Sequence, residues 1–341
     1  MEMEKLDLGS VHKRVNGDPV KGVVLVSSYD RRKTKNDKPF IDGTLKLVGG
    51  GINFKIWAGS ICTDFIKYDY NNVVIYLSAT IAVFNDAKYL EINHVQVLDG
   101  YSPEDFMNTP YDKNLYSKGL EDLARQNTSD KGFDLLTKIL FSNPDKNVFH
   151  NGSGEWGNQK IYDRFKVEFA AKSVHDACKS GLLGHTYKIL YFLISSIGLY
   201  PNILKERDDL GELVFSQDRK DLLVIGSILH DIGKTLELHY GVYQPNTALT
   251  HRMLGMEYLY QFKDDIVSAY GDKWYYDLLS IVVQHHHIYD EKARTLPAYI
   301  IHLIDMFESG LTRLSDKIES GGDLATSGEV LKVDRDTHLH M

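Results

Sequence analysis

The sequence has few cysteines and no long apolar run. Only Cys62 and Cys178 occur among 341 residues, and they fall in different predicted domains. Two separated cysteines indicate no disulfide framework, so we expect a reducing, cytoplasmic location. The apolar runs, such as 189–197, are too short to cross a bilayer, so no membrane partner is expected. The charged start of the chain is not typical of a signal peptide.

An excess of positive charge is also lacking. The net charge is -8, whereas a protein that coats nucleic acid by surface charge alone is usually basic. The negative total remains compatible with a local basic patch, or with a metal site that supplies its own positive charge. With 43% apolar and 25% charged residues, the composition is that of a globular protein, and the length suffices for two domains.

The first hundred residues alternate between apolar and polar side chains and are rich in β-branched types. This period of two is typical of strands. Several short strands in about 80 residues predict a small closed barrel, for which the five-stranded OB-fold is the common solution. We therefore expect an OB-type barrel over residues 19–100, after a loose lead-in over 1–18. The candidate strands are 23–29, 40–48, 53–58, 73–83 and 92–98.

After Pro103 the apolar positions follow a helical period. Short helices at 119–127 and 133–141 predict a helical linker over 101–160. From Tyr162 onward only helices are expected, in an all-α domain over 161–318, before a disordered tail over 319–341. The fold class is thus α+β and multidomain. The helices expected in the second domain are 163–179, 182–198, 220–232, 249–267, 274–287 and 297–317.

The stretch from Gly226 to Lys234 contains the strongest chemical signal. An apolar helix ends on His230 and Asp231, then Gly233 breaks it. Imidazole and carboxylate together suit divalent ions such as Mn²⁺, Fe²⁺, Co²⁺, Zn²⁺ or Mg²⁺. A His-Asp pair alone is weak, because His175-Asp176 is a second one and a helix C-cap would explain either.

Further candidate ligands lie on other predicted helices. Asp305 is inside an apolar helix, where a carboxylate is costly unless it is paired or binds a metal. His185 begins another helix, and could equally be a partly buried structural residue. His251, His285 and His286 lie between them along the chain; they could hold a second ion, contact phosphate or occupy a polar cleft.

The segment between the first two predicted strands is basic, and aromatic residues Phe40 and Trp57 occur nearby. Cationic loops beside stacking rings are typical of single-strand binding without sequence preference. The alternative is that the rings fill the barrel core and the loop is simply solvated. The basic residues are Arg31, Arg32, Lys33, Lys35 and Lys38.

The order His185, His230-Asp231, Asp305 resembles that of the HD-domain phosphohydrolases. More narrowly, the chain resembles the YhaM family of 3′→5′ exoribonucleases, which join an OB-fold to an HD domain. The similarity covers about residues 18–317. The matching stretches are Lys38-Pro39-Phe40, Ile56-Trp57, Gly181-Leu182-Leu183-Gly184-His185, Ile228 to Lys234, and Gln284-His285-His286.

The resemblance implies a 3′→5′ exonuclease on single-stranded RNA, or DNA, that releases nucleoside 5′-monophosphates. It implies one or two divalent ions, Mn²⁺ first, held by His185, His230, Asp231 and Asp305. Asp231, Lys234 and His251 would carry the chemistry. Of these, Lys234 and His251 would offset negative charge on the phosphoryl oxygens. Homo-oligomerisation stays open.

Four departures from the family pattern leave substrate choice and metal number open. Gly184 stands where the family usually has Glu, and His175-Asp176 where it often has paired His. His287 replaces a Gly, and Glu308 replaces an Asp. One alternative function is a phosphodiesterase for free nucleotides or a nucleotide second messenger. Another is a non-catalytic single-strand-binding module.

Overall fold

The computed structural model describes two compact units, Met1–Pro110 and Tyr111–Met341. Each unit has its own hydrophobic core. The described residues are 3–48, 50–57, 73–84, 87–99, 101, 103–106, 110–142, 144, 160–171, 176–243, 249–286 and 292–319.

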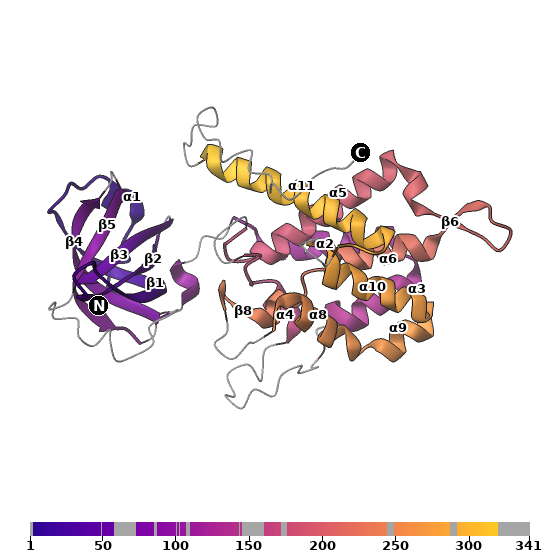
Figure 1. Ribbon diagram of the computed structural model, residues 1–341, viewed down its shortest axis with the longest axis horizontal. Coiled ribbons are helices and arrows are strands. Elements are labelled where there is room, and N and C mark those ends of the chain that lie inside the picture. Colours follow the sequence, from indigo (N-terminus) through magenta and orange to yellow (C-terminus); the bar gives the residue numbers. More distant parts are fainter. Residues whose placement is uncertain are drawn as a thin grey trace. The chain divides into compact units, whose positions relative to one another are not determined.

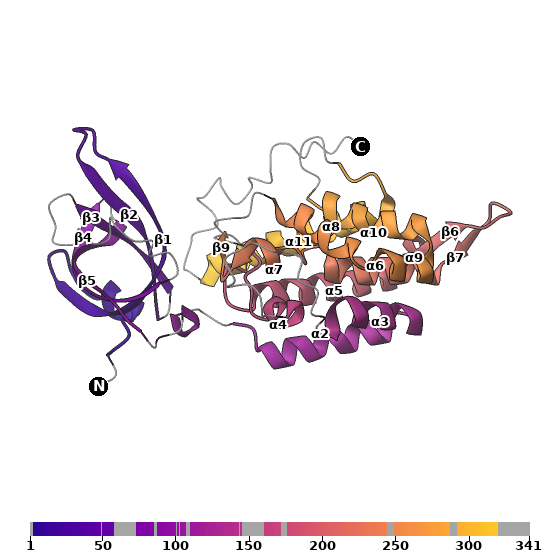
Figure 2. The ribbon, with the colours of Figure 1, turned by 90° about the horizontal axis from the view of Figure 1, so that it is seen from below.

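The first unit is a closed barrel with the strand order β1-β2-β3-β5-β4. All pairings are antiparallel except β3 with β5, which is parallel. Figure 2 shows the strands closing into a ring. This arrangement confirms the expected OB-type barrel. The strands are β1 (Pro19–Lys33), β2 (Pro39–Leu47), β3 (Gly50–Trp57), β4 (Val73–Phe84) and β5 (Ala87–Val97).

Alternation along the strands separates the barrel core from its outer surface. On β3, Ile52, Phe54 and Ile56 are buried, while Lys55 and Trp57 point outward. The inward side chains fill the small interior, as in other closed barrels of this size. The same alternation therefore places the polar and aromatic residues between them on the barrel's outer face.

The lead-in is ordered, contrary to the expectation of a loose segment. Leu6 and Val11 are buried in the barrel core, with Val11 in α1 (Leu8–His12). Asp7 caps α1 by accepting a hydrogen bond from the Ser10 backbone N–H. Two apolar residues in a polar segment were enough to anchor it, because each gains from burial against the barrel.

The second unit packs helices around the central pair α5 and α6 (Figure 1). α5 contacts α2, α6 and α11, and α6 contacts α10. The helices are α2 (Lys113–Asn127), α3 (Asp130–Leu136), α4 (Ile161–Phe165), α5 (Gly181–Leu199), α6 (Gln217–Leu229), α7 (Lys234–Glu237), α8 (His251–Tyr260), α9 (Lys263–Tyr270), α10 (Asp272–Gln284) and α11 (Leu296–Glu319). A π-helical turn (Thr137–Phe141) follows α3, and short 3₁₀ turns lie at Pro103–Phe106 and Pro201–Leu204.

Several expected helices differ in the structure. The helix expected over 163–179 is reduced to α4, and Asp176 and Ser180 adopt left-handed backbone angles that no helix tolerates. The helix expected over 249–267 is two, α8 and α9, with a break at residues 261–262.

The second unit also contains strands and takes in the supposed linker. Two small hairpins interrupt the region expected to be only helical: β6 (Lys205–Arg207) with β7 (Leu213–Phe215), and β8 (Leu238–His239) with β9 (Val242–Tyr243). α2 and α3, assigned to a linker from the sequence, pack against α5 and α6 inside this unit. The predicted disordered tail lies, apart from Glu319, outside the described residues.

α5 is one helix that is long and apolar enough, by length and composition alone, to cross a membrane. It is longer than the apolar run considered in the sequence. Its buried residues include Leu183, His185 and Leu190, and it lies against α2, α6 and α11. Its apolar character thus accompanies a place in the core of this unit.

Gly43 offers a test of the barrel. A Cβ at this position would lie 2.1 Å from the Ser28 carbonyl oxygen and 2.7 Å from the Tyr29 Cα. Gly43→Ala should destabilise the barrel by about 3 kcal/mol, since backbone cannot move aside cheaply. Gly51→Ala is the control, because its nearest neighbour would be at an ordinary 3.4 Å. Urea unfolding measures both, and equal midpoints would contradict the strand packing described.

Candidate metal centre and barrel surface

Four helices and one turn bring the candidate ligands together. His230 caps the end of α6, and Asp231 follows in the turn before α7. Gly233 lets this turn touch α8, because a Cβ there would lie 1.8 Å from the His251 carbonyl oxygen. α5 supplies His185, α8 His251, the end of α10 His285 and His286, and α11 Asp305.

A first group of ligand atoms is buried around one oxygen of Asp231. Asp231 Oδ2 lies 3.3 Å from His230 Nε2 and 3.7 Å from His185 Nε2. His185 Nε2 is also 3.3 Å from Asp305 Oδ1. All four residues are buried. The ligand atoms of His185, His230 and Asp231 lie within 4.8 Å of one another, and those of His230 and Asp305 form a second such set with His285.

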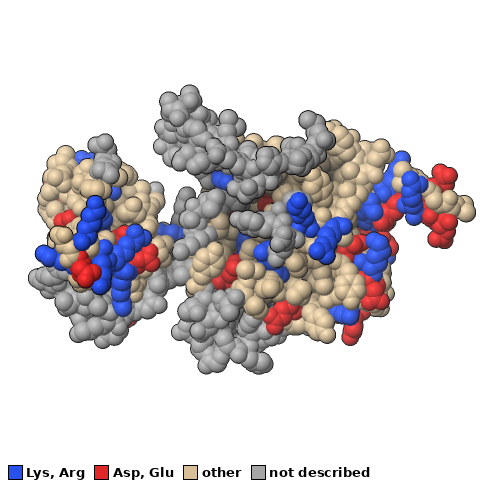
Figure 3. All heavy atoms as spheres, viewed as in Figure 1, with Lys and Arg blue, Asp and Glu red and all other residues tan. Residues whose placement is uncertain are grey.

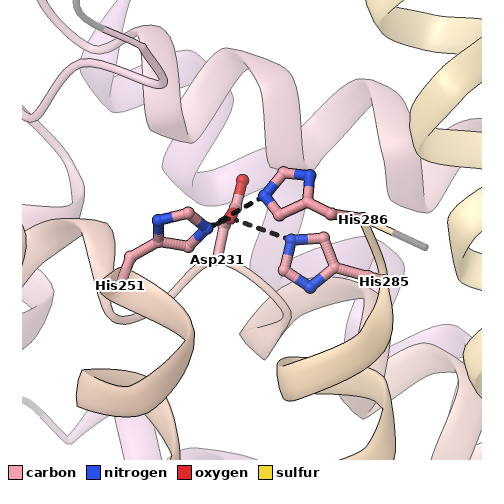
Figure 4. Close-up of side chains that lie close together, drawn as sticks. All are labelled: Asp231, His251, His285 and His286. Atoms are coloured by element: carbon pink, nitrogen blue, oxygen red, sulfur yellow. Dashed lines mark hydrogen bonds and ion pairs between the residues drawn. The ribbon is translucent and has the colours of Figure 1, made fainter. Parts of the chain in front are cut away.

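A second group gathers around the other oxygen of Asp231 (Figure 4). Asp231 Oδ1 lies 3.4 Å from His285 Nε2 and 3.6 Å from His251 Nε2. His286 completes the group, with its Nε2 atom 3.0 Å from that of His251. His251 and His286 are only half-buried, so this group is the more accessible one. Asp231 thus faces both groups, one oxygen to each.

The rings of four histidines are held from behind. In each, Nδ1 faces an acceptor, which places a proton on Nδ1 and points Nε2 into the cluster. Two acceptors are carboxylates and two are backbone carbonyls. The pairs are His185 with Glu308 (2.6 Å), His251 with Glu237 (2.9 Å), His230 with the Ser227 carbonyl (2.8 Å) and His285 with the Val282 carbonyl (3.0 Å).

The converging atoms are suited to a divalent ion. His230 Nε2, His285 Nε2 and Asp231 Oδ1 are buried and have no hydrogen-bond partner among the described residues. Leaving three such atoms unsatisfied is costly, whereas imidazole nitrogen and carboxylate oxygen are good ligands for divalent ions. The side chains present therefore fit a metal centre.

The charge states also suit metal binding. Burial alone would raise the pKa of Asp231 and Asp305. Lys234 and His230 nevertheless hold the pKa of Asp231 well below the usual range, and neighbouring histidines, His185 first, do the same for Asp305. Burial lowers the pKa of His285, and burial together with His285 lowers that of His286 to about 2. Ionised carboxylates and neutral imidazoles are the forms that coordinate metals.

His185 is the exception. Burial lowers its pKa, but the hydrogen bonds and charges of Asp305 and Glu308 outweigh burial and raise the pKa to about 10. Without an ion, His185 therefore carries an extra proton at neutral pH. An ion that takes His185 Nε2 as a ligand must displace that proton.

Metal binding should consequently release a proton from His185. Below pH 10, the affinity should rise about tenfold for each pH unit from this group, since the proton and the ion compete. Calorimetric Mn²⁺ titrations in two buffers of different ionisation enthalpy measure the release. His286→Ala, which changes only the second group, should keep it. Binding without proton release at pH 7 would show that His185 is not a ligand.

The outer face of the barrel carries an aromatic cluster around one lysine. Lys55 Nζ lies 4.7 Å from the ring centre of Tyr89 and 5.4 Å from those of Trp57 and Phe84. Trp57 also stacks on Phe40, with ring centres 5.2 Å apart. Trp57 and Phe84 are 38% and 63% exposed. These five side chains, here called the aromatic platform, come from four strands and face away from the core.

The basic residues of the β1–β2 hairpin, here called the basic loop, are exposed but partly paired. Contrary to expectation, Arg31, Arg32 and Lys33 end β1 and are not in the connection between the strands, whereas Lys35 and Lys38 are in that connection. Arg32 contacts Asp42 and Asp30, and Lys33 contacts Asp37. Figure 3 accordingly shows acidic side chains among the basic ones on the barrel. Surface pairs of this kind contribute little, so phosphates can replace the carboxylates at small cost. Arg31, Lys35 and Lys38 are exposed in the same hairpin.

The structure brings together all seven sequence-predicted metal ligands. Lys234 is there too, with Nζ 2.6 Å from Asp231 Oδ2. Sequence reasoning missed Glu237, which holds His251, and the platform residues Lys55 and Tyr89. Alternation on β3 could have revealed Lys55, which shares the face of Trp57. His175 and His287 lie outside the described residues.

Comparison with known proteins agrees with this organisation. The sequence profile of the HD domain family matches residues 185–310, so the second unit contains an HD domain. Over nearly nine-tenths of its length the chain is similar to proteins named 3′-5′ exoribonuclease YhaM, which confirms the resemblance inferred from the motifs. That of Listeria monocytogenes serotype 4b is 26% identical over 315 residues, covering 89% of this chain and 88% of the relative. That of Oceanobacillus iheyensis is 25% identical, covering 90% and 89%.

Two solved structures are also similar to part of the chain. The mitochondrial protein Rim1 of S. cerevisiae is 11% identical, covers 25% of this chain and 96% of its own, and gives a TM-score of 0.22. The second OB-fold domain of replication protein A from Methanococcus maripaludis is 11% identical, covers 25% and 86%, and gives 0.19.

Proposed function

We propose that this chain is a metal-dependent 3′→5′ exonuclease that acts on single-stranded nucleic acid, RNA before DNA, and releases nucleoside 5′-monophosphates. The observation that carries the proposal is Asp231, whose two oxygens face two groups of imidazole nitrogens, one buried and one more accessible. The similarity to 3′-5′ exoribonucleases, which extends over both units, supplies the polarity and the substrate class.

The ligand geometry supports two ions. His185, His230, Asp231 and Asp305 would hold the first, and Asp231, His251, His285 and His286 the second. When bound, divalent ions polarise phosphoryl oxygens and lower the pKa of an attacking water. Several imidazoles beside few carboxylates favour a transition ion over Mg²⁺, and among these we propose Mn²⁺.

Lys234 is placed to offset phosphoryl charge. Burial lowers the pKa of the Lys234 ammonium group, but the Asp231 carboxylate raises this pKa by more than burial lowers it. The ammonium group therefore stays charged. Its present partner is Asp231 Oδ2. Once that carboxylate is shared with ions, the ammonium group can turn to an oxygen of the scissile phosphate, where developing negative charge attracts it. His251, 14% exposed, is at the accessible side of the cluster.

The barrel would bind the strand. Base rings can stack on Trp57 and Phe84 in a sequence-tolerant way, while Lys55 and the basic loop contact phosphates. The platform and the loop lie on the strand face and the β1–β2 and β4–β5 hairpins, which OB-folds use for oligonucleotides.

Two other functions remain to be separated from this one. A phosphodiesterase for a free nucleotide would not need an aromatic platform on a separate barrel. A non-catalytic binding module would not need a complete set of metal ligands, whereas this chain has a His or an Asp at all seven candidate positions. The platform therefore favours a polymer over a small substrate, and the ligands favour an enzyme over a module.

The reaction itself can be followed on a 5′-labelled single strand. With Mn²⁺, RNA should shorten one nucleotide at a time, and a blunt duplex should resist. Asp231→Ala should lose both ions and at least about a thousandfold of the rate, because its oxygens serve both groups. His286→Ala should lose one ion, and His94→Ala, on the barrel surface, none. Early internal cuts, or activity confined to mononucleotides, would contradict the exonuclease assignment.

Substitutions in the platform should separate binding from hydrolysis. Lys55→Ala with Trp57→Ala should weaken single-strand binding about 5- to 150-fold, as stacking on one base contributes about 1–3 kcal/mol. The salt dependence should become shallower by about one phosphate contact. Hydrolysis of bis-p-nitrophenyl phosphate should not change. Lys21→Ala, an exposed lysine elsewhere on β1, is the control. If the platform variant and the control bind single strands equally well, the platform does not bind the strand.

A further inference from the structure

Behind His185 lies a chain of charged groups that the reaction does not itself use; its carboxylates are buried and its lysine is partly exposed. Glu308 Oε2 accepts the proton of His185 Nδ1 at 2.6 Å. The other oxygen, Oε1, lies 2.5 Å from Lys188 Nζ and accepts from the Thr312 hydroxyl at 2.6 Å. Lys188 continues to Asp176, with Nζ 3.0 Å from Oδ2. The side chains of Asp176 and Glu308 are almost fully buried.

This chain depends on a glycine next to the ligand. Tyr111 donates its hydroxyl proton to Asp176 Oδ1, and its ring lies over Gly184. A Cβ at position 184 would be 2.6 Å from three carbons of that ring. Any side chain at Gly184 would therefore push Tyr111 off Asp176. The same ring is 5.4 Å from the Lys188 ammonium group, a further favourable contact for that charge.

Lys188 occupies the position of a cation. One oxygen each of Asp176 and Glu308 and the Nδ1 of His185 lie within 4.8 Å of one another, a geometry that could itself hold a metal ion. The ammonium group lies between the two carboxylates instead. Without it, two buried negative charges would repel each other, and Glu308 would move away. That movement would weaken its hold on His185.

We propose that Lys188 is a positioning residue that acts as a fixed cation. It keeps Glu308 aimed at His185 Nδ1, so that His185 Nε2 is presented to the first ion. Tyr111 and Gly184 hold the far end of this chain in place through Asp176. The inference rests on the proposed metal-dependent function and deepens it, since it assigns the support of one ion and not the other.

The contacts of Lys188 explain why it should support the first ion and not the second. Among the described residues, the hydrogen bonds of Lys188 end on Asp176, Glu308 and Thr312. None of these supports His251, which is held by Glu237, or His285, which is held by a backbone carbonyl. A purely structural role for Lys188 would instead weaken both ions together, through a general loosening of the unit.

The test is a Mn²⁺ titration of the full chain in two backgrounds that isolate the ions. His286→Ala leaves the first site, and Asp305→Asn leaves the second. Lys188→Met should weaken Mn²⁺ binding about 10- to 100-fold in the His286→Ala background, the range found when a ligand loses its supporting partner. In the Asp305→Asn background it should change binding less than about threefold. Lys273→Met is the control, because this exposed lysine contacts only Asp277 among the described residues.

Each result has one meaning. Unchanged affinity in the His286→Ala background, or equal losses in both, would overturn the positioning role. Circular dichroism checks that Lys188→Met folds; if it does not, Glu308→Gln, which removes the charge but keeps the volume, should give the same selective loss. If the unsubstituted protein binds no divalent ion, the proposed function fails. If it binds ions and degrades RNA while Lys188→Met binds normally, only this inference fails.

Discussion

The helical unit depends on the burial of two carboxylates, Asp231 and Asp305, inside an apolar core. An isolated buried carboxylate is several kcal/mol unfavourable, so such groups survive only when cations, hydrogen bonds or metal ions compensate them. Here the compensation comes from Lys234, from histidines of four helices and from the ions that these atoms fit. The ends of α6 and α10 and the start of α5 are all positioned by this requirement.

The surroundings of the cluster keep an excess of negative charge. Beyond Asp231 and Asp305, the carboxylates of Glu237, Glu308 and Asp176 lie further out, and the cations that contact these five groups within the described part of the chain include Lys188, Lys234 and the protonated His185. Divalent ions would restore the balance, and their binding would then stabilise this unit. Because the second group is the more exposed, its side of the cluster is also where a phosphate could enter.

Two departures from the family pattern turn out to be neighbours in space. Gly184 makes room for Tyr111, whose hydroxyl binds Asp176, and Asp176 leads through Lys188 to Glu308. In this chain, Gly184 and Glu308 therefore belong to one connected set of contacts. In the barrel, the alternation along β3 likewise serves two purposes. It places Phe54 in the core, and it places Lys55 and Trp57 on the outer platform.

The sequence by itself determined the barrel, most of the helices and the seven metal-ligand candidates. Period-two and helical patterns report local burial, and a carboxylate in an apolar helix, such as Asp305, is conspicuous without any structure. Only the tertiary structure decided that Asp231 divides its oxygens between two groups, that Glu237 and Glu308 hold His251 and His185, and that Lys188 takes a cation's place. Those partners come from segments far apart in the chain. Their pairing depends on how closely α5, α8 and α11 approach, and no local pattern records that distance. The left-handed residues Asp176 and Ser180 are incompatible with the helix expected over 163–179, and a periodic apolar pattern does not record such backbone angles.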